Sequence, residues 1–358
     1  MSEAVLKVGG SSLSNATNVR NVARIIVEYY LTHPDAELDI AVSAFGAEPG
    51  KGKDYGVTNT LLRAADHAYN GNLEAALKEI GNVKKIHYRI VDDLRFDRAV
   101  VELGLSTLEE KIKAAVRERE EGAQLNQNGL RDAIAGDGEL LSTPVLALEV
   151  QSLLKDVFDR YETLRAGRES QRARSAPLML LSEVMSARIL GREAFLAVMD
   201  PESELSQKIY ERLKSCNGQY VAVLNPKKQG FITDSNFTKA RLLDESLDTE
   251  IARHHIQTRA KNKNRILLLP GFVAEDKYGN QTTIGRDGTN ETAVALASAR
   301  KAEEIVIYSD RDGVEIVDSR IIGQSQTSRY LSYWEMVLLA RWGGMKALQE
   351  SSLHILNR

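Results

Sequence analysis

The sequence has few residues that form covalent or metal cross-links. It contains one cysteine, Cys216, in 358 residues. A single thiol excludes a disulfide within the chain and a metal site built from several cysteines. We therefore interpret Cys216 as a small, partly buried hydrophobic side chain.

The sequence also lacks a long hydrophobic run and an excess of either charge. Its longest apolar stretch, residues 266–274, is interrupted by Pro270 and Gly271 and is much shorter than the roughly 20 residues that span a bilayer. No basic and apolar signal region opens the chain. Lys and Arg number 47 against 50 Asp and Glu, so a net charge of −3 produces no general attraction to nucleic acids. These absences predict a soluble, cytoplasmic protein that binds neither nucleic acid nor a membrane.

What the sequence does contain is an alternation of strand-like and helix-like segments. Residues 4–8 form a β-branched run that ends in a pair of glycines, residues 18–30 carry apolar side chains at helical spacing, and residues 38–44 are again strand-like. Strand, glycine turn, helix and strand in this order are typical of a parallel α/β unit. Residues 45–56 are rich in glycine and lysine and are expected to form a loop.

The region from residue 58 to about 168 has a different character, because it is long, charged and periodic. Amphipathic helices are predicted there at residues 73–101, 108–120 and 147–164. Strand-like segments return afterwards, at residues 195–199, 220–224, 230–233, 266–269 and 305–308. Helical segments lie between or after them, at residues 204–214, 250–258, 292–302 and 331–348.

The turn after the first strand suits an anionic ligand. Lys7 precedes Gly9 and Gly10, which allow a sharp turn with exposed amides, and Ser11 and Ser12 add hydroxyls. The order differs from a Walker loop, in which the lysine follows the glycines. The motif therefore indicates either a phosphate site or a plain strand-to-helix turn.

A second polar segment, residues 281–292, leads into an apolar helix. Thr289 and Asn290 are natural N-cap residues, so a helix start explains them. Arg286 lies in a glycine-flanked turn just before, where a guanidinium group either clamps a carboxylate or faces solvent. The strand at residues 305–308 ends in a further polar turn, 309–313, and ligands of open α/β sheets gather at such strand ends.

The order of these segments resembles one family, the aspartate kinases. Residues 7–13 (Lys-Val-Gly-Gly-Ser-Ser-Leu) resemble the opening motif of that family, and residues 182–187 resemble its Gly-Glu-Arg-Leu-Ser-Ala helix. Further similar segments follow the family's order, at residues 42–44 with 56–62, 232–237, 270–272, the arginine turn, 309–313, 331–333 and 344–346. The resemblance covers essentially the whole chain, and it is more specific for the broad amino acid kinase family than for one substrate.

This resemblance implies a three-layer α/β/α sandwich with a mainly parallel sheet, the amino acid kinase fold. It implies an amino-terminal lobe, residues 1–257, that binds the amino acid and contains a helical insertion at about 70–168. A carboxy-terminal lobe, residues 258–358, is expected to bind ATP. Aspartate kinases ordinarily continue into regulatory ACT domains, for which this sequence has no counterpart.

The resemblance also implies the roles of individual residues. The ATP side would comprise Lys7, Gly9, Gly10, Ser11, Ser12, Ser309, Asp310, Arg320 and Lys346. The amino-acid side would comprise Ser43, Thr58, Glu183, Arg286 and Thr289. In this scheme Glu183 binds the substrate ammonium group and Arg286 its α-carboxylate. The catalytic set would be Lys7, Asn290 and Lys346, with Mg²⁺ bridging the phosphates of ATP.

One departure from the family pattern leaves the activity open. Asn290 stands where aspartate kinases usually have an aspartate thought to organise the catalytic lysines, and Glu291 is a possible substitute. The first hypothesis is an ATP-dependent kinase that phosphorylates the side-chain carboxylate of aspartate or a close analogue, in a specialised biosynthetic pathway. The alternative is a catalytically impaired homologue that binds nucleotide or amino acid as a partner subunit. A homodimer is expected in either case.

Overall fold

The computed structural model describes residues 3–169, 203–285, 288–308, 314–315, 327–343 and 348–357. Helices are the commonest described elements: α1 (Ala16–Thr32), α2 (Val57–Tyr69), α3 (Leu73–Leu94), α4 (Ala99–Glu120), α5 (Gln127–Ala135), α6 (Asp137–Glu169), α9 (Glu204–Ser215), α10 (Ile251–Lys261), α11 (Gly288–Arg300), α13 (Tyr333–Leu338) and α14 (Glu350–Leu356). Short 3₁₀ or π turns are η1 (Ser11–Leu13), η2 (Lys53–Tyr55), η3 (Pro226–Lys228), η4 (Ser246–Glu250) and η5 (Leu339–Gly343).

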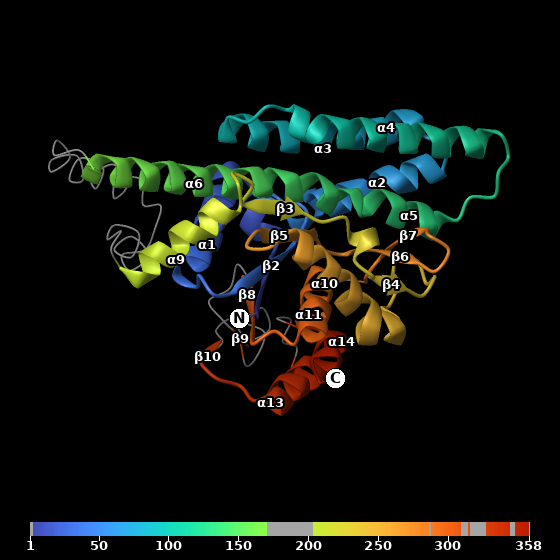
Figure 1. The fold of residues 1–358 in the computed structure, drawn as a ribbon. Helices are drawn as coiled ribbons and strands as arrows, with labels where there is room; N and C mark the ends of the chain where they lie inside the picture. Colours follow the sequence, from blue (N-terminus) through green and yellow to red (C-terminus); the bar gives the residue numbers. More distant parts are fainter. Residues whose placement is uncertain are drawn as a thin grey trace.

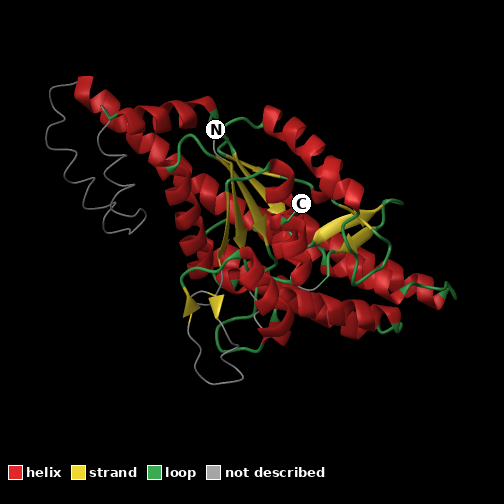
Figure 2. Ribbon diagram, turned by 90° about the horizontal axis from the view of Figure 1, so that it is seen from below, coloured by secondary structure: helices red, strands yellow, loops and turns green. Residues whose placement is uncertain are grey.

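The described strands are β1 (Glu3–Val8), β2 (Glu37–Val42), β3 (Val221–Val223), β4 (Ile232–Thr233), β5 (Ile266–Pro270), β6 (Val273–Asp276), β7 (Gln281–Thr283), β8 (Glu304–Tyr308), β9 (Val314–Glu315) and β10 (Thr327–Ser328). Five of them form a central sheet in the order β3-β5-β2-β1-β8, and each neighbouring pair in it is parallel. Val8 pairs with Val42 and with Tyr308, and Val42 pairs with Pro270. The carboxyl ends of β1, β2, β5 and β8 therefore lie level at one edge of the sheet (Figures 1 and 2).

Side-chain alternation along β1 divides the interior into two cores. Leu6 and Val8 pack in the core with α1 and α6, whereas Val5 packs in the core with α11. Helices thus cover both faces of the sheet, as Figure 2 shows. The three-layer α/β/α sandwich with a parallel sheet, predicted from the sequence, is confirmed. The sheet takes strands from both sides of residue 258, and the proposed division into lobes at that point stays a prediction.

The helical region differs in detail from the sequence prediction. Residues 73–101 are two helices, because α3 ends at Leu94 and Arg95 has a left-handed backbone with φ of 65°. The amide of Phe96 then donates to the carbonyl of Val91, which closes the helix end. The helix predicted at 147–164 begins ten residues earlier, at Asp137, and runs through Pro144. Acidic side chains at its first turn favour that start, and α3 and α4 pack as a pair over α2 and α6 (Figure 1).

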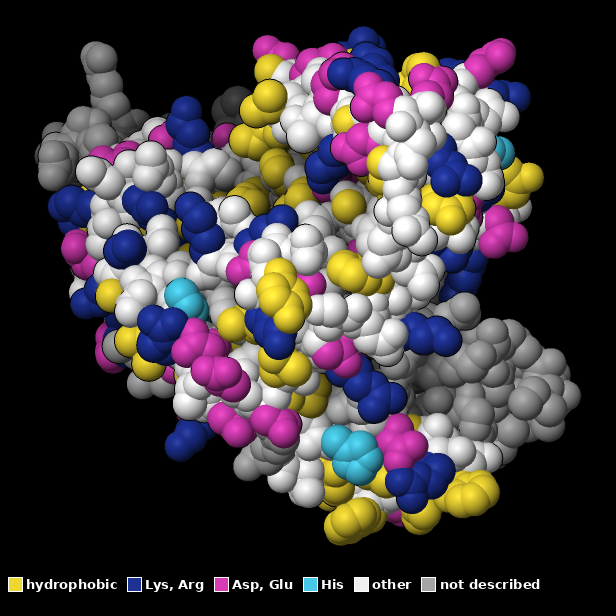
Figure 3. Space-filling model, turned by 90° about the vertical axis from the view of Figure 1, so that its right-hand side faces the viewer, with side chains coloured by type: hydrophobic (Ala, Val, Ile, Leu, Met, Phe, Trp, Pro, Cys, Tyr) yellow, Lys and Arg dark blue, Asp and Glu magenta, His cyan; other side chains and the backbone are white. Residues whose placement is uncertain are grey.

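A smaller sheet and the end of the chain account for the other differences. Strands β6 and β7 were not expected, and they form an antiparallel pair that joins β4 in a three-stranded sheet. Of the helix predicted at 331–348, the structure describes α13, which begins at Tyr333 and passes into η5, and residue 348, which is not helical; α14 begins at residue 350. The described part of this region exposes large apolar side chains, and Figure 3 shows hydrophobic side chains at the end of the molecule where α13 and α14 lie. By their exposed fractions, the large apolar side chains open to solvent between residues 330 and 342 are Tyr330, Trp334, Leu338 and Trp342.

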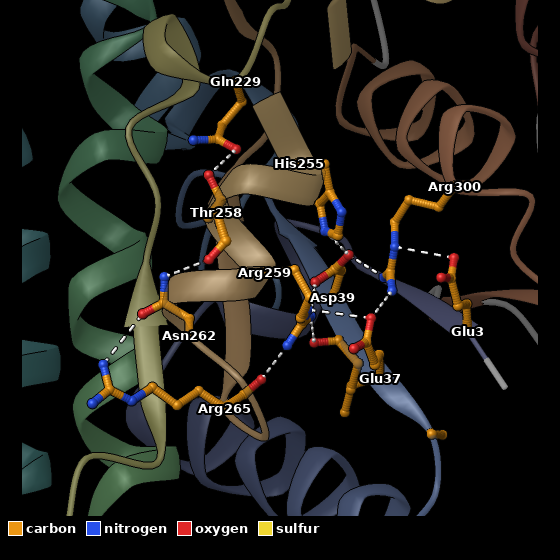
Figure 4. Close-up of polar contacts among 12 residues, drawn as sticks. Glu3, Glu37, Asp39, Gln229, His255, Thr258, Arg259, Asn262, Arg265 and Arg300 are labelled. Atoms are coloured by element: carbon orange, nitrogen blue, oxygen red, sulfur yellow. Dashed lines mark hydrogen bonds and ion pairs between the residues drawn. The ribbon is translucent and has the colours of Figure 1, made fainter. Parts of the chain in front are cut away.

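A buried ion network joins β2 to α10 and α11 near the amino ends of the strands (Figure 4). The carboxylate of Asp39 in β2 pairs with Arg259 of α10 and Arg300 of α11, and Nε2 of His255 lies 2.8 Å from it. Arg300 also contacts Glu37 at 3.1 Å. Arg259 and Arg300 lie in the last turns of their helices, where positive charge is favourable. The network therefore fixes the far end of α11, whose first turn reaches the opposite edge of the sheet.

Candidate active site

The carboxyl edge of the central sheet brings the turns after three strands together. The amide of Ser43, which follows β2, donates to the carbonyl of Val8 at 3.2 Å. The amide of Gly271, which follows β5, donates to the carbonyl of Val42 at 2.8 Å. Because binding sites of open α/β sheets form at this edge, it is the candidate site.

The glycine turn after β1 is held by its own backbone and by the neighbouring loop. The amide of Ser12 donates to the carbonyl of Gly9 at 3.1 Å, which starts η1. The amide of Gly46 donates to the carbonyl of Gly10 at 2.9 Å. A Cβ atom on Gly10 would lie 2.8 Å from the carbonyl oxygen of Ala44, so only glycine permits this approach. Gly46, which the sequence reading did not single out, is thus part of the turn.

Lys7 reaches the same edge from the face that α11 covers. It lies one residue before the end of β1 and on the same face as Val5, which packs against α11. Its Nζ atom lies 3.1 Å from the position that a Cβ atom would take on Gly9. The half-buried ammonium group therefore stands directly beside the glycine turn, as the sequence predicted for a phosphate site.

The first turn of α11 also contacts this edge. Thr289 and Asn290 are buried, and Thr289 packs so closely on Gly271 that a Cβ atom there would lie 2.6 Å from its methyl group. The helix begins at Gly288, so the prediction that Thr289 and Asn290 are N-caps is wrong. The hydroxyl of Thr292 explains the earlier start, because it donates to the carbonyl of Gly288 and accepts from the amide of Phe272.

Glu291, the possible substitute for the expected aspartate, is bonded to the carboxy-terminal helix. Its carboxylate accepts a hydrogen bond of 2.9 Å from the hydroxyl of Ser351 in α14. Burial raises the pKa of this carboxyl, and the hydrogen bond from Ser351 opposes that change. The side chain is therefore engaged with α14.

The other helical layer brings a buried carboxyl to the edge, that of Glu139 in the first turn of α6. Burial raises its pKa to about 8, and the backbone amide of Ala44, which donates to it, opposes this change. Its Oε2 atom has no hydrogen-bond partner in the described part of the chain. A carboxyl group that is buried and only half satisfied at a strand edge is a strong candidate for a ligand contact.

Sequence reasoning missed Glu139, although a signal for it exists. Residues 138–143 read Gly-Glu-Leu-Leu-Ser-Thr, which match the Gly, Glu, Leu and Ser positions of the Gly-Glu-Arg-Leu-Ser-Ala motif. Residues 182–187, to which that motif was assigned, match the Glu, Ser and Ala positions. The close packing of Gly138 against Ala44, with a Cβ position 3.0 Å from the Ala44 methyl, gives the glycine of the motif a physical reason.

Ser43 and Thr58 lie on the loop and helix beside Glu139. The carbonyl of Ser43 accepts a hydrogen bond of 2.8 Å from the hydroxyl of Ser142 in α6. Thr58 is the second residue of α2, whose first amide, that of Val57, donates to the carbonyl of Phe45 at 3.1 Å. Both predicted residues are half-buried and border the same edge as Glu139.

The remaining predicted site residues lie outside the described residues. They are Glu183, Arg286, Ser309, Asp310, Arg320 and Lys346. Within the described ranges, no three His, Cys, Asp or Glu side chains gather as the ligands of a metal ion would. In the same ranges, every helix is too short or too polar to cross a bilayer.

Comparison with known proteins identifies relatives along the whole chain. An aspartate kinase of Stutzerimonas stutzeri is 41% identical over 118 residues, which are 33% of this chain and 27% of that protein. The chloroplastic aspartokinase 1 of Arabidopsis thaliana is 25% identical over 342 residues, which are 95% of this chain and 45% of that protein.

The fold is also shared with a solved structure, that of Escherichia coli aspartokinase III in complex with aspartate and ADP. The TM-score is 0.65 at 18% identity, over 99% of this chain and 59% of that chain. The chain therefore spans less than two thirds of the length of each of these relatives. The model of the amino acid kinase family matches residues 3–358, and we conclude that the chain belongs to the amino acid kinase family.

Proposed function

We propose that the chain transfers the γ-phosphoryl group of ATP to the side-chain carboxylate of aspartate or a close analogue. A carboxylate oxygen attacks the γ-phosphorus, the bond from that phosphorus to the β–γ bridging oxygen breaks, and ADP leaves with the bridging oxygen. The products are an acyl phosphate and ADP. Because both reactants are anions, the site has to concentrate positive charge where the phosphoryl group moves.

The observation that carries the proposal is the approach of Lys7 and Glu139 to one sheet edge from opposite layers. Lys7 stands beside the glycine turn on the α11 face, and Glu139 contacts Ala44 from α6. A cation suits the phosphoryl group, and a carboxylate suits the ammonium group of an amino acid. The opposite charges that an amino acid kinase requires thus belong to the same edge.

On the nucleotide side, Lys7 would neutralise charge on the transferred phosphoryl group. The amides after Gly9 and the hydroxyls of Ser11 and Ser12 would bind phosphate oxygens. Ser309, Asp310, Arg320 and Lys346 remain proposed contacts of ATP. Mg²⁺ would enter with ATP and be held mainly by phosphate oxygens and water, as is usual for this ion.

On the amino-acid side, Glu139 is the described residue best suited to the ammonium group. An incoming ammonium group favours the ionised carboxylate and so opposes the burial that raises the pKa of Glu139. Arg286 would bind the α-carboxylate, while Ser43, Thr58 and Thr289 would add hydrogen bonds. Support for aspartate comes from the related aspartokinase III, whose structure contains aspartate and ADP.

The test is an ADP-release assay with MgATP and a panel of acceptors that includes aspartate and related amino and phosphonic acids. We expect turnover with aspartate or one close analogue. Lys7→Met should abolish it, whereas Lys113→Met, which removes an exposed lysine of α4, should leave it unchanged. Folded protein that is silent across the whole panel would refute the proposed activity.

One observation favours the alternative of an impaired homologue that acts as a binding subunit. Asn290 replaces the expected aspartate, and the neighbouring Glu291 is bonded to Ser351. Nucleotide or amino-acid binding without turnover would support this second function. Under the first function, the same replacement is one of the departures from the family pattern that lead us to propose a specialised biosynthetic pathway.

A further inference from the structure

The corner between α5 and α6, just before Glu139, contains a largely buried ion pair. Nζ of Lys111 in α4 lies 2.7 Å and 2.8 Å from the two carboxylate oxygens of Asp137. The side chain of Asp137 is 7% exposed and that of Lys111 is 35% exposed. The helix pair α3–α4 is thereby tied to the first residue of the helix that carries Glu139.

Other contacts hold the same corner in place. Lys111 also donates to the carbonyl of Ala133 at 3.2 Å. From the opposite side, the amide group of Gln281 in β7 donates to the carbonyls of Asp132 and Ala133, each at 3.2 Å. Hydrogen bonds from α4 and from β7 therefore hold the corner from two sides, which restricts movement of the start of α6.

The carboxylate of Asp137, two residues before Glu139, influences the ionisation of Glu139. Burial raises the pKa of Glu139, and the negative charge of Asp137 raises it further. Burial also raises the pKa of Asp137, while Lys111 opposes this, with smaller contributions from Gln281 and from Lys227 of η3. Lys111 is thus the main cation that compensates Asp137. The ionised form of Glu139 itself is favoured by backbone amides, those of Ala44 and of Glu139.

We propose that Lys111 is a positioning residue for Glu139: its ion pair with Asp137 holds the first turn of α6 against the site and compensates the charge beside Glu139. The positioning of Glu139 by Lys111 does not depend on the proposed function. Only its consequence, the binding of a substrate ammonium group, rests on that function. Without Lys111, the pair of carboxyls formed by Asp137 and Glu139 would lose its second proton only at a higher pH. The substrate ammonium group would then have to compete with that proton for the pair.

The first experiment needs no substrate. The unfolding free energy is measured from pH 5 to 10 for the wild type, Lys111→Met, Asp137→Asn and each of these combined with Glu139→Gln. In each background, the change in unfolding free energy caused by Glu139→Gln is plotted against pH, and the pH at which this change levels off reports where Glu139 loses its proton in the folded chain. We expect Lys111→Met to raise that pH, because it removes the cation that compensates Asp137, and Asp137→Asn to lower it, because it removes the negative charge beside Glu139. Each shift should be at most about one unit.

The second experiment measures the KM values for amino acid and ATP and the pH profile of kcat/KM. Lys111→Met should raise the KM for the amino acid about tenfold near neutral pH and leave the KM for ATP unchanged. The acid limb of the kcat/KM profile should move to higher pH. Asp137→Asn should restore the profile in the double variant. The matched control is Lys113→Met, because Lys113 lies on the same helix and pairs with Glu110 in solvent.

The outcomes separate the two proposals. If Lys111→Met lowers stability but leaves the ionisation of Glu139 at the wild-type pH, Lys111 has only a structural role and the inference is overturned. If the ionisation shifts as expected while the wild type shows no turnover with any acceptor, the inference stands and the proposed kinase function fails.

Discussion

The guanidinium group of Arg300, in the last turn of α11, pairs with the buried carboxylate of Asp39 in β2. The first turn of the same helix packs Thr289 against Gly271 at the candidate site. One end of α11 is therefore held by charge and the other by close packing. This arrangement connects the ion network at the amino ends of the strands with the site at their carboxyl ends.

Asp39→Asn is expected to destabilise the protein strongly. The substitution leaves Arg259 and Arg300 buried with less compensating charge, and the loss of one partner from such a pair costs about 3–5 kcal/mol. Urea unfolding at pH 7 measures the effect. The control is Asp35→Asn, because Asp35 pairs with Lys208 in solvent and should change stability by less than about 1 kcal/mol.

The same variant should reveal the pH dependence of the Asp39 network. Burial alone would raise the pKa of Asp39, but Arg259, the hydrogen bond from His255 and Arg300 outweigh it and hold that pKa at about 2. A lowered carboxyl pKa stabilises the fold above the unfolded value, near 4, and this contribution is lost as the pH falls towards 2. The stability gap between wild type and Asp39→Asn should therefore narrow over that interval, and a gap that stays constant would contradict the assignment.

His87 is expected to make the unfolding free energy depend on pH between about 6.5 and 4, above the interval in which Asp39 acts. Burial lowers its pKa to about 4, although its hydrogen bond with the carbonyl of Val83 opposes this. A lowered histidine pKa stabilises the fold above about pH 6.5, and this contribution is lost between pH 6.5 and 4. His87→Leu should reduce the slope of unfolding free energy against pH in that window by about 1.4 kcal/mol per unit.

Glu139→Gln should weaken amino-acid binding and yet stabilise the free protein in alkali. A raised carboxyl pKa means that stability falls as the pH rises from about 4.5 through about 8, and glutamine removes this loss. We expect a higher Tm than wild type at pH 9 and a KM for aspartate raised about 100-fold, with the KM for ATP little changed. Glu183→Gln is the matched comparison, since an effect on the KM for aspartate confined to that variant would assign the ammonium group to Glu183.

Gly46→Ala should disturb the glycine turn from the neighbouring loop. A Cβ atom at this position would collide with the carbonyl of Gly10 and lie 2.9 Å from the amide nitrogen of Ser11. We expect a loss of about 1–3 kcal/mol in stability and a higher KM for ATP, because the loops that follow β1 and β2 would separate. Gly52→Ala is the control, as nothing lies within 4 Å of its Cβ position and its φ of −61° suits alanine.

Asn290→Asp tests whether the missing carboxylate limits catalysis. Under the proposed kinase function, wild type already turns over, and an added carboxylate in the first turn of α11 should change kcat only modestly. A large rise in kcat with unaltered binding of aspartate and ATP, measured by calorimetry, would instead support the impaired homologue. Glu291→Gln should have little effect on kcat in either case, because its carboxylate is bonded to Ser351.

Local patterns in the sequence were sufficient for much of the fold. Period-two and helical spacing, with a glycine pair between them, predicted β1, α1 and β2, and these elements place Lys7 beside its turn. The break between α3 and α4 was not predicted, because Arg95 takes a left-handed backbone that its residue type does not favour. The two short strands β6 and β7 were missed since their pairing, more than their composition, makes them strands.

The sequence by itself determined the parallel α/β unit and the cationic glycine turn, because those features depend on neighbours a few residues apart. Only the tertiary structure decided that Glu139 lies at the sheet edge, since its burial depends on α6 packing against Ala44. The same holds for Asp39 and Arg300, which are 261 residues apart in the chain. Local propensity carries no information about such distant pairs, which form when the two helical layers close on one sheet.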